Sequence, residues 1–215
     1  MLLENLGDVI RVNAKHYRNK LAFFCEGTRR TFFEFNERVN RLVNSLYASG
    51  MKNGDRLGII ASNRIEFMEV YGAAEKGGFV AVPLNSRLDR SEIAYIVQNS
   101  GTSAIIAEGR FAHLVRDLSV PNIYVFAPEK EDVATYEFLI ATGDPVEPDV
   151  PIHPKDAVCL MYTGGTTGSP KGVLLDHGGQ MANTKCMLIE VSMLPEDTLL
   201  TVMPLHHIGG KNFAT

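Results

Sequence analysis

Four apolar runs of strand length alternate with helical patterns in the middle of the chain, and this alternation limits the possible folds most strongly. The runs span residues 55–61, 79–84, 103–107 and 122–127. They are apolar almost throughout rather than at every second position, as strands buried on both faces require. Between them, apolar residues recur at helical spacing, for example over residues 91–99. This order predicts an α/β fold with mostly parallel sheets flanked by helices.

Local patterns predict where several of these elements begin and end. Thr31 and Glu34 form a capping box that opens a helix, and Gly50 supplies the end of that helix. Asn63 is a second plausible helix cap, and Pro83 is expected to end the strand in which it lies. Further strands are expected at residues 156–163, 172–177 and 198–204, and a helix at residues 180–190.

Residues 127–155 have the composition of a connection between two lobes. They contain five of the ten prolines, many acidic residues and one short helical stretch. We therefore expect approximate lobes at residues 1–50, 51–150 and 151–215.

Composition excludes several classes of protein. The chain has 215 residues, a formal net charge of −4 and an ordinary apolar content of 45%. It has no basic stripe for binding nucleic acid, no signal-peptide pattern and no apolar run near the ~18 residues of a membrane span. Cys25, Cys159 and Cys186 are odd in number and far apart, which favours reduced and buried thiols. These features indicate a cytoplasmic protein with small-molecule partners.

The segment MYTGGTTGSPKGV, residues 161–173, has the composition of a phosphate-binding loop. It holds four glycines, three threonines, a serine and one lysine. Glycines let successive backbone amides converge on an anion, hydroxyls add donors, and Lys171 adds a positive charge. Because Pro170 precedes the lysine, the spacing is not that of a Walker A loop, and it does not fit a dinucleotide fingerprint either. The apolar run after the loop predicts that it leads into a strand.

Residues 162–172 resemble the phosphate-binding signature of the adenylate-forming (AMP-binding) superfamily, which includes acyl-CoA synthetases and aryl-CoA ligases. Ten of the eleven residues fit the usual Y-T-S-G-T-T-G-x-P-K-G, and Gly164 stands where serine is commonest. The segment PLHHIGG, residues 204–210, is similar to the family's P-L-[FY]-H-x-x-G, with His206 where an aromatic residue is usual. Residues 31–85 resemble the opening of family members throughout.

The resemblance implies a two-step reaction. A substrate carboxylate attacks the α-phosphate of ATP, which is accompanied by Mg2+, and a thiol, usually that of coenzyme A, then displaces AMP from the acyl-adenylate. By resemblance, His207 is the catalytic residue and lines the acyl pocket with Gly209 and Gly210. The implied nucleotide-binding residues are Thr163, Gly164, Gly165, Thr166, Thr167, Gly168 and Lys171.

The resemblance also implies that the other parts of the machinery follow Thr215. These are the segments that bind adenine and ribose, the glutamate that holds Mg2+ and the small C-terminal domain. No metal ligand is therefore expected within the chain. We expect the chain to be the N-terminal portion of the large domain and to be inactive in ligation by itself.

Other functions remain open from the sequence. One is an adenylation domain that loads an amino acid onto a carrier protein. Another is a non-catalytic nucleotide-binding module, and a third is a structural α/β domain with an accidental loop. Among carboxylic acids, fatty, aryl and carnitine-like substrates all remain candidates.

Overall fold

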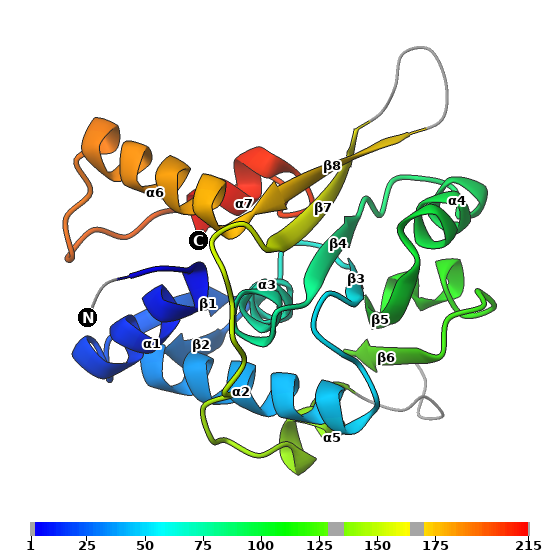
Figure 1. Ribbon diagram of the computed structural model, residues 1–215, viewed down its shortest axis with the longest axis horizontal. Coiled ribbons are helices and arrows are strands. Elements are labelled where there is room, and N and C mark those ends of the chain that lie inside the picture. Colours follow the sequence, from blue (N-terminus) through cyan, green and yellow to red (C-terminus); the bar gives the residue numbers. More distant parts are fainter. Residues whose placement is uncertain (1–2, 129–135, 164–169, 215) are drawn as a thin grey trace.

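The computed structural model describes residues 3–128, 136–163 and 170–214. A six-stranded sheet runs through the molecule in the order β6-β5-β3-β4-β7-β8 (Figure 1). Neighbouring strands are parallel except for β7 and β8, which are antiparallel. The predicted α/β fold with a mostly parallel sheet is confirmed. The strands are β3 (Arg56–Ile60), β4 (Val80–Leu84), β5 (Thr102–Glu108), β6 (Asn122–Phe126), β7 (Ala157–Thr163) and β8 (Lys171–Asp176).

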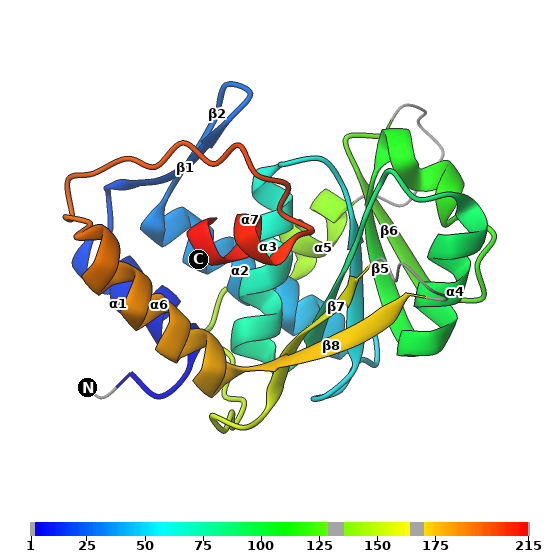
Figure 2. The same ribbon diagram turned by 90° about the horizontal axis from the view of Figure 1, so that it is seen from above.

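Helices cover both faces of the central strands of this sheet, whereas the edge strand β8 is largely exposed (Figure 2). Because side chains alternate along a strand, Leu57 and Ile59 of β3 join the core on one face, whereas Ile60 joins the core on the other. Burial of both faces explains why the strand is apolar throughout. The covering elements are α2 (Phe32–Ala48) and α3 (Ile65–Gly77) on the first face, and α4 (Arg90–Ser100) with a 3-10 helix (Gly109–Leu114) on the second.

The remaining elements lie around this three-layer centre. A two-stranded antiparallel hairpin is separate from the main sheet, and its turn places Glu26 and Gly27 at positive φ. Neither this hairpin nor the first helix was predicted from the sequence. The elements are α1 (Leu6–His16), β1 (Leu21–Cys25), β2 (Thr28–Thr31), α5 (Tyr136–Thr142), α6 (His177–Val191) and α7 (Ile208–Ala214).

One predicted helix cap is confirmed and the other is wrong. The side chain of Thr31 accepts a hydrogen bond from the amide of Glu34, whose carboxylate accepts from the amide of Thr31. In contrast, α3 begins after Arg64 without any side-chain cap bond. Asn63 instead bonds to the backbone of Met203 and Leu205, far along the chain. A pattern of neighbouring residues could not reveal that the Asn63 side chain bonds to a distant segment instead of capping α3.

Two predicted strand features are also corrected. Pro83 does not end its strand, since β4 runs on to Leu84. In the described chain β4 pairs with β7 only at Ala81 and Cys159, so the strand tolerates a residue that has no N–H. The strand expected at residues 198–204 does not form: the segment is irregular, and no described strand pairs with it to satisfy its backbone.

The proline-rich connection packs against the helices rather than standing apart from them. Arg38 of α2 forms ion pairs with Glu69 of α3 and with Glu137 of α5. Ser45 Oγ donates to the carbonyl of Leu139 at 2.7 Å. The three approximate lobes stay a prediction; strands of the second and third lie in one sheet.

The three cysteines differ in burial. Cys159 is buried, Cys25 is half-buried and Cys186 is exposed, so the expectation of buried thiols holds for Cys159 alone. All three are unpaired thiols. Within the described ranges, no helix combines the length and the apolar character that crossing a membrane requires.

The ammonium of Lys76 leads to a first prediction. It is fully buried and donates to Asn36 Oδ1 at 2.6 Å, to Asn40 Oδ1 and to Glu147 Oε2 at 2.6 Å. Glu147→Gln removes its counter-charge, and we expect the free energy of unfolding to fall by about 2–3 kcal/mol, less than for a fully buried pair because Glu147 is half-exposed. Urea denaturation measures the loss.

Glu137→Gln is the matched control for this variant. Glu137 is 59% exposed, and its partner Arg38 keeps Glu69 as a second partner. We therefore expect this control to lose less than about 1 kcal/mol. Equal losses in the two variants would show that burial of Lys76 does not depend on Glu147.

His177 leads to a second prediction, concerning pH. It is fully buried, its Nδ1 accepts from the amide of Leu6 at 3.4 Å, and burial lowers the pKa of the imidazole from 6.5 to about 4, with Asp156 opposing. Between these values the unfolded chain binds a proton that the folded chain does not, so the free energy of unfolding falls as the pH falls.

We expect His177→Phe to flatten this dependence, whatever its effect on stability at pH 7. The measurement is the slope of the free energy of unfolding between pH 6.5 and 4, from urea denaturation at several pH values. His16→Gln, which changes an exposed histidine, is expected to keep the wild-type slope. The explanation fails if the slope of His177→Phe also stays at the wild-type value.

Candidate functional site

The two strands that flank the glycine-rich loop bring two predicted site residues face to face. In the antiparallel register of β7 and β8, Thr163 lies opposite Lys171, and Thr163 Oγ1 donates to the carbonyl of Lys171 at 3.4 Å. Both residues are exposed. The prediction that the loop leads into a strand is confirmed, since β8 begins at Lys171. The other predicted nucleotide-binding residues, which lie outside the described residues, are Gly164, Gly165, Thr166, Thr167 and Gly168.

The stem of this loop is held firmly on both sides. Tyr162 donates its hydroxyl to Asn99 Oδ1 of α4 at 2.6 Å. A Cβ at Gly172 would lie 2.9 Å from Leu160 Cδ1. A larger residue at position 172 would therefore require the Leu160 side chain to shift. These contacts of Tyr162 and Gly172 fix the positions of the two described ends of the loop.

Lys171 and Thr163 stand at the edge of the sheet where ligands of α/β proteins bind. The carboxyl ends of parallel strands share one edge, and Thr163 is the last residue of β7. Asn63 follows the end of β3, and Arg87 follows the end of β4, at the same edge. The residues that follow β3 and β4 therefore lie at the same edge of the sheet as Thr163.

The segment with the predicted catalytic histidine is anchored by Asn63, which follows β3, and by Tyr71 of α3. Asn63 Oδ1 accepts from the amide of Leu205 at 3.0 Å, and Asn63 Nδ2 donates to the carbonyl of Met203 at 2.9 Å. The hydroxyl of Tyr71 donates to the carbonyl of Leu205 at 2.6 Å. Neither Asn63 nor Tyr71 was predicted as a site residue. No sequence signal marked Tyr71, and Asn63 was assigned to a helix cap.

The two adjacent histidines occupy a turn that leads into α7. The amide of His207 donates to the carbonyl of Pro204 at 3.0 Å. His207 is exposed, and its Nδ1 accepts from the amide of Gly209 at 3.4 Å. His206 is half-buried, and its pKa is lowered by burial first and then by the neighbouring charges of His207 and Arg87. The exposed imidazole of His207 is thus the one available to a ligand from outside.

The two glycines after His207 have different surroundings. A Cβ at Gly210 would lie 2.1 Å from the carbonyl oxygen of Pro204, so only glycine allows α7 to begin so close to the turn. Gly209 has more room, since its Cβ would be 3.3 Å from Met203 Sδ. Gly210 is buried and Gly209 is half-buried. Their contribution to an acyl pocket stays a prediction.

The structure thus groups the predicted residues in two sets. Thr163 and Lys171 face each other at the stem, and His207 lies with Gly209 and Gly210 in a single turn. Among the described residues, no hydrogen bond or ion pair joins the two sets. No group of three or more His, Cys, Asp or Glu that could hold a metal occurs in the part of the chain described here.

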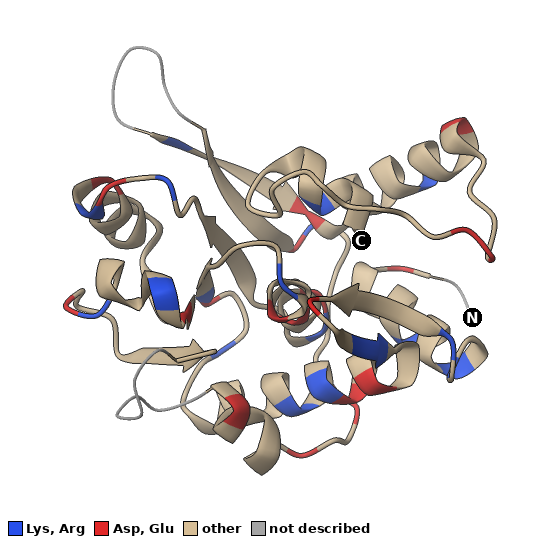
Figure 3. Cartoon of the chain, turned by 180° about the vertical axis from the view of Figure 1, so that it is seen from behind, with Lys and Arg blue, Asp and Glu red and all other residues tan. Residues whose placement is uncertain are grey.

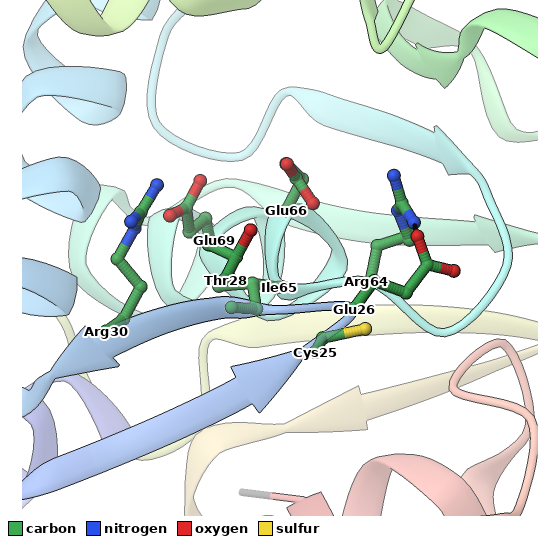
Figure 4. Close-up of a pocket in the computed structure, with 8 residues that line it drawn as sticks. All are labelled: Cys25, Glu26, Thr28, Arg30, Arg64, Ile65, Glu66 and Glu69. Atoms are coloured by element: carbon green, nitrogen blue, oxygen red, sulfur yellow. Dashed lines mark hydrogen bonds and ion pairs between the residues drawn. The ribbon is translucent and has the colours of Figure 1, made fainter.

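Two hollows lie away from these residues. A small cleft of about 70 Å³ between the β1–β2 hairpin and the start of α3 is shown in Figure 4, and an apolar groove of about 300 Å³ lies between α1, α6 and α7. At the cleft, Arg64 pairs with Glu26, and Glu69 pairs with Arg38, whereas the buried Nε of Arg30 has no hydrogen-bond partner among the described residues. None of the predicted site residues that the structure describes lines either hollow. Figure 3 shows Lys and Arg interspersed with Asp and Glu along the described part of the chain.

Known proteins resemble the chain over nearly its whole length. The model of the family described as AMP-binding enzyme matches residues 10–214. Feruloyl-CoA synthase of Amycolatopsis sp is 34% identical over 84% of this chain and 35% of that protein. Crotonobetaine/carnitine–CoA ligase of Salmonella arizonae is 32% identical over 89% and 40%. Fatty acid–[acyl-carrier-protein] ligase ScoC of Streptomyces coeruleorubidus is 30% identical over 99% and 41%. The chain therefore spans 35–41% of the length of these relatives.

Solved structures share the fold. The inhibitor-bound N-terminal domain of FACL13 from Mycobacterium tuberculosis is 26% identical and has a TM-score of 0.86, covering 99% of this chain and 54% of that chain. ATP-bound MatB from Rhodopseudomonas palustris is 22% identical with a TM-score of 0.86, covering 99% and 42%, which shows a likeness of fold alone. Because the family match takes in both the loop stem and the turn with His207, the chain belongs to the AMP-binding enzyme family.

Proposed function

We propose that this chain is the N-terminal part of an ATP-dependent, AMP-forming acyl-CoA synthetase. The observation that carries the proposal is the register of β7 and β8, in which exposed Thr163 and Lys171 meet at the carboxyl edge of the sheet. A hydroxyl and an ammonium at the two ends of a glycine-rich loop suit a polyphosphate. The relatives that act as CoA ligases support the same assignment.

In the proposed reaction, a carboxylate oxygen forms a bond to the α-phosphorus of ATP, and the bond to the bridging oxygen breaks to release pyrophosphate. Bringing two anions together is the main physical difficulty. Lys171 and Thr163 would reduce it by holding the β- and γ-phosphates, together with the amides of the loop. We assign Mg2+ to the triphosphate, whose charge it would partly neutralise, rather than to a residue of this chain.

His207 would act on the other reactant. Its imidazole is exposed in a turn that is fixed to α3 through Leu205. In the proposal it borders the carboxylate and the adenylate, with Gly209 beside it. In the second half-reaction, the thiolate of coenzyme A attacks the acyl carbonyl, and AMP leaves with the bonding electrons. The carboxylic acid itself is left open among fatty, aryl and carnitine-like acids.

A carrier-protein thiol is the second candidate acceptor. The relative ScoC, whose name describes ligation of a fatty acid to acyl-carrier protein, is 30% identical over 99% of this chain. The residues described here bear on activation of the acid rather than on the acceptor. Supplying coenzyme A or a carrier protein to the acyl-adenylate distinguishes the two candidates.

We further propose that the 215 residues do not catalyse ligation alone. The share of each relative that the chain spans supports this, because it is 35–41%. Carboxylate-dependent exchange between ATP and pyrophosphate is the assay. Exchange catalysed by the 215 residues would refute this part of the proposal, and a panel of acids tested on the longer gene product would identify the substrate.

The proposed role of Lys171 predicts a loss of ATP affinity in Lys171→Ala. Removing one charge-assisted hydrogen bond of about 1.5–3 kcal/mol should weaken binding by roughly 10- to 100-fold. Lys155→Ala is the matched control, because Lys155 is also exposed but lies before the opposite end of β7. Calorimetry with ATP and with pyrophosphate measures both variants. Equal affinities of the two variants would contradict binding of phosphate by Lys171.

A separate prediction concerns His207→Ala in the gene product that contains this chain. Carboxylate-dependent exchange should fall by about 10- to 100-fold through loss of orientation, while the affinity for ATP stays within about twofold. The two readouts are exchange rate against carboxylate concentration and calorimetric ATP binding. If ATP affinity falls and exchange at saturating ATP does not, His207 belongs to the nucleotide side instead.

A further inference from the structure

A fully buried lysine lies one turn beyond His207. Lys211 of α7 is 0% exposed, and its Nζ is 3.4 Å from Glu75 Oε1 of α3 and 3.4 Å from Gln180 Oε1 of α6. The same Nζ lies 5.1 Å from the centre of the Tyr71 ring. Glu75 is also buried, at 4% exposed. One ammonium thus connects three helices in the interior.

A buried ion pair of this kind is stable only when its two charged groups are held close together. Taking two charges out of water is unfavourable, and the cost is recovered only while the charges stay close. Burial raises the pKa of the Glu75 carboxyl, and the charge of Lys211 lowers it again. Any displacement of α7 would move the ammonium of Lys211 away from the carboxylate of Glu75. Apolar side chains at the same place would tolerate several arrangements of the helix.

The pair is linked to the predicted acyl side of the site by short connections. The backbone amide of Lys211 donates to the carbonyl of His207 at 3.0 Å. Tyr71, whose ring lies beside the Lys211 ammonium, donates its hydroxyl to the carbonyl of Leu205 at 2.6 Å. The turn that carries His207 is therefore held from α3 and from α7 at once. A shift of α7 would move the imidazole.

We propose that Glu75 and Lys211 are positioning residues, whose buried ion pair sets the place of α7 and so aims His207 at the carboxylate-binding side of the site. This inference rests on the proposed function, in which His207 borders the carboxylate. It assigns a role to two residues that were not among the predicted site residues. The predicted phosphate-binding residues Thr163 and Lys171 lie on β7 and β8, whereas Glu75 and Lys211 lie on helices.

The test uses three variants and one control. Glu75→Gln and Lys211→Met each remove one charge, and the double variant Glu75→Gln/Lys211→Met removes both. Lys185→Met is the control, because it removes an exposed lysine from α6. In the gene product that contains this chain, KM for the carboxylate and KM for ATP are measured for all four. The ring NMR signals of His207 and the amide hydrogen exchange of residues 208–214 are measured on the 215-residue chain.

For Glu75→Gln and Lys211→Met we expect KM for the carboxylate to rise by about tenfold, because a displaced His207 no longer orients the carboxylate. KM for ATP should stay within about twofold, because Thr163 and Lys171 are not displaced. Amide exchange in α7 should quicken by about tenfold or more, whereas exchange in α4 should not change. The double variant should regain thermal stability while keeping the raised KM and the altered His207 signals. Lys185→Met should match the wild type in every readout.

Two results would overturn the inference. If the double variant recovers the wild-type carboxylate KM and His207 signals, the pair contributes only to packing. If the single variants change both KM values equally, the pair does not act through His207. If the wild type shows no carboxylate-dependent turnover, the proposed function fails. The positioning of His207 is then tested by its ring NMR signals and by amide hydrogen exchange in α7, which need no substrate.

Discussion

Helix α3 is enclosed on almost every side, and much of the structure is arranged around that burial. Twelve of its thirteen residues are buried. Three of these carry a charge, and a buried charge must meet a partner because an unpaired one is too costly. The partners come from distant parts of the chain, so pairing with α3 decides where those parts lie. The pairs are Glu69 with Arg38, Lys76 with Glu147, and Glu75 with Lys211.

The sheet imposes a second constraint on the site. Helices cover both faces of the central strands β3, β4 and β5, so a ligand can reach these strands only at their ends. The stem of the glycine-rich loop and the turn with His207 both belong to this edge, although about forty residues separate Thr163 from His207 in the sequence. Asn63 joins the second of these segments to the end of β3. Two side chains, Asn63 and Tyr71, thereby hold the segment that leads to His207, which does not belong to a strand.

Sequence patterns predicted the elements whose cause is local. Thr31 caps α2 because the threonine and the glutamate three residues later satisfy each other's amides, which requires nothing from the rest of the chain. Asn63 shows the same pattern and was assigned wrongly, since its side chain meets Met203 and Leu205 instead. The strand expected at residues 198–204 failed for a related reason. A strand needs a neighbouring strand to satisfy its backbone N–H and C=O groups, and an apolar run does not show whether such a neighbour exists.

The sequence by itself determined the mostly parallel α/β fold, because continuous apolar runs require burial on both faces. It also predicted a phosphate-binding loop, because glycines with one lysine suit a phosphate. By resemblance, it predicted Lys171 and His207 as site residues. Only the tertiary structure decided that Thr163 stands opposite Lys171, that His207 is exposed while His206 is half-buried, and that Lys211 reaches Glu75. These relations join residues far apart in the chain, and they depend on packing and on the pairing of buried charges, which no local spacing encodes.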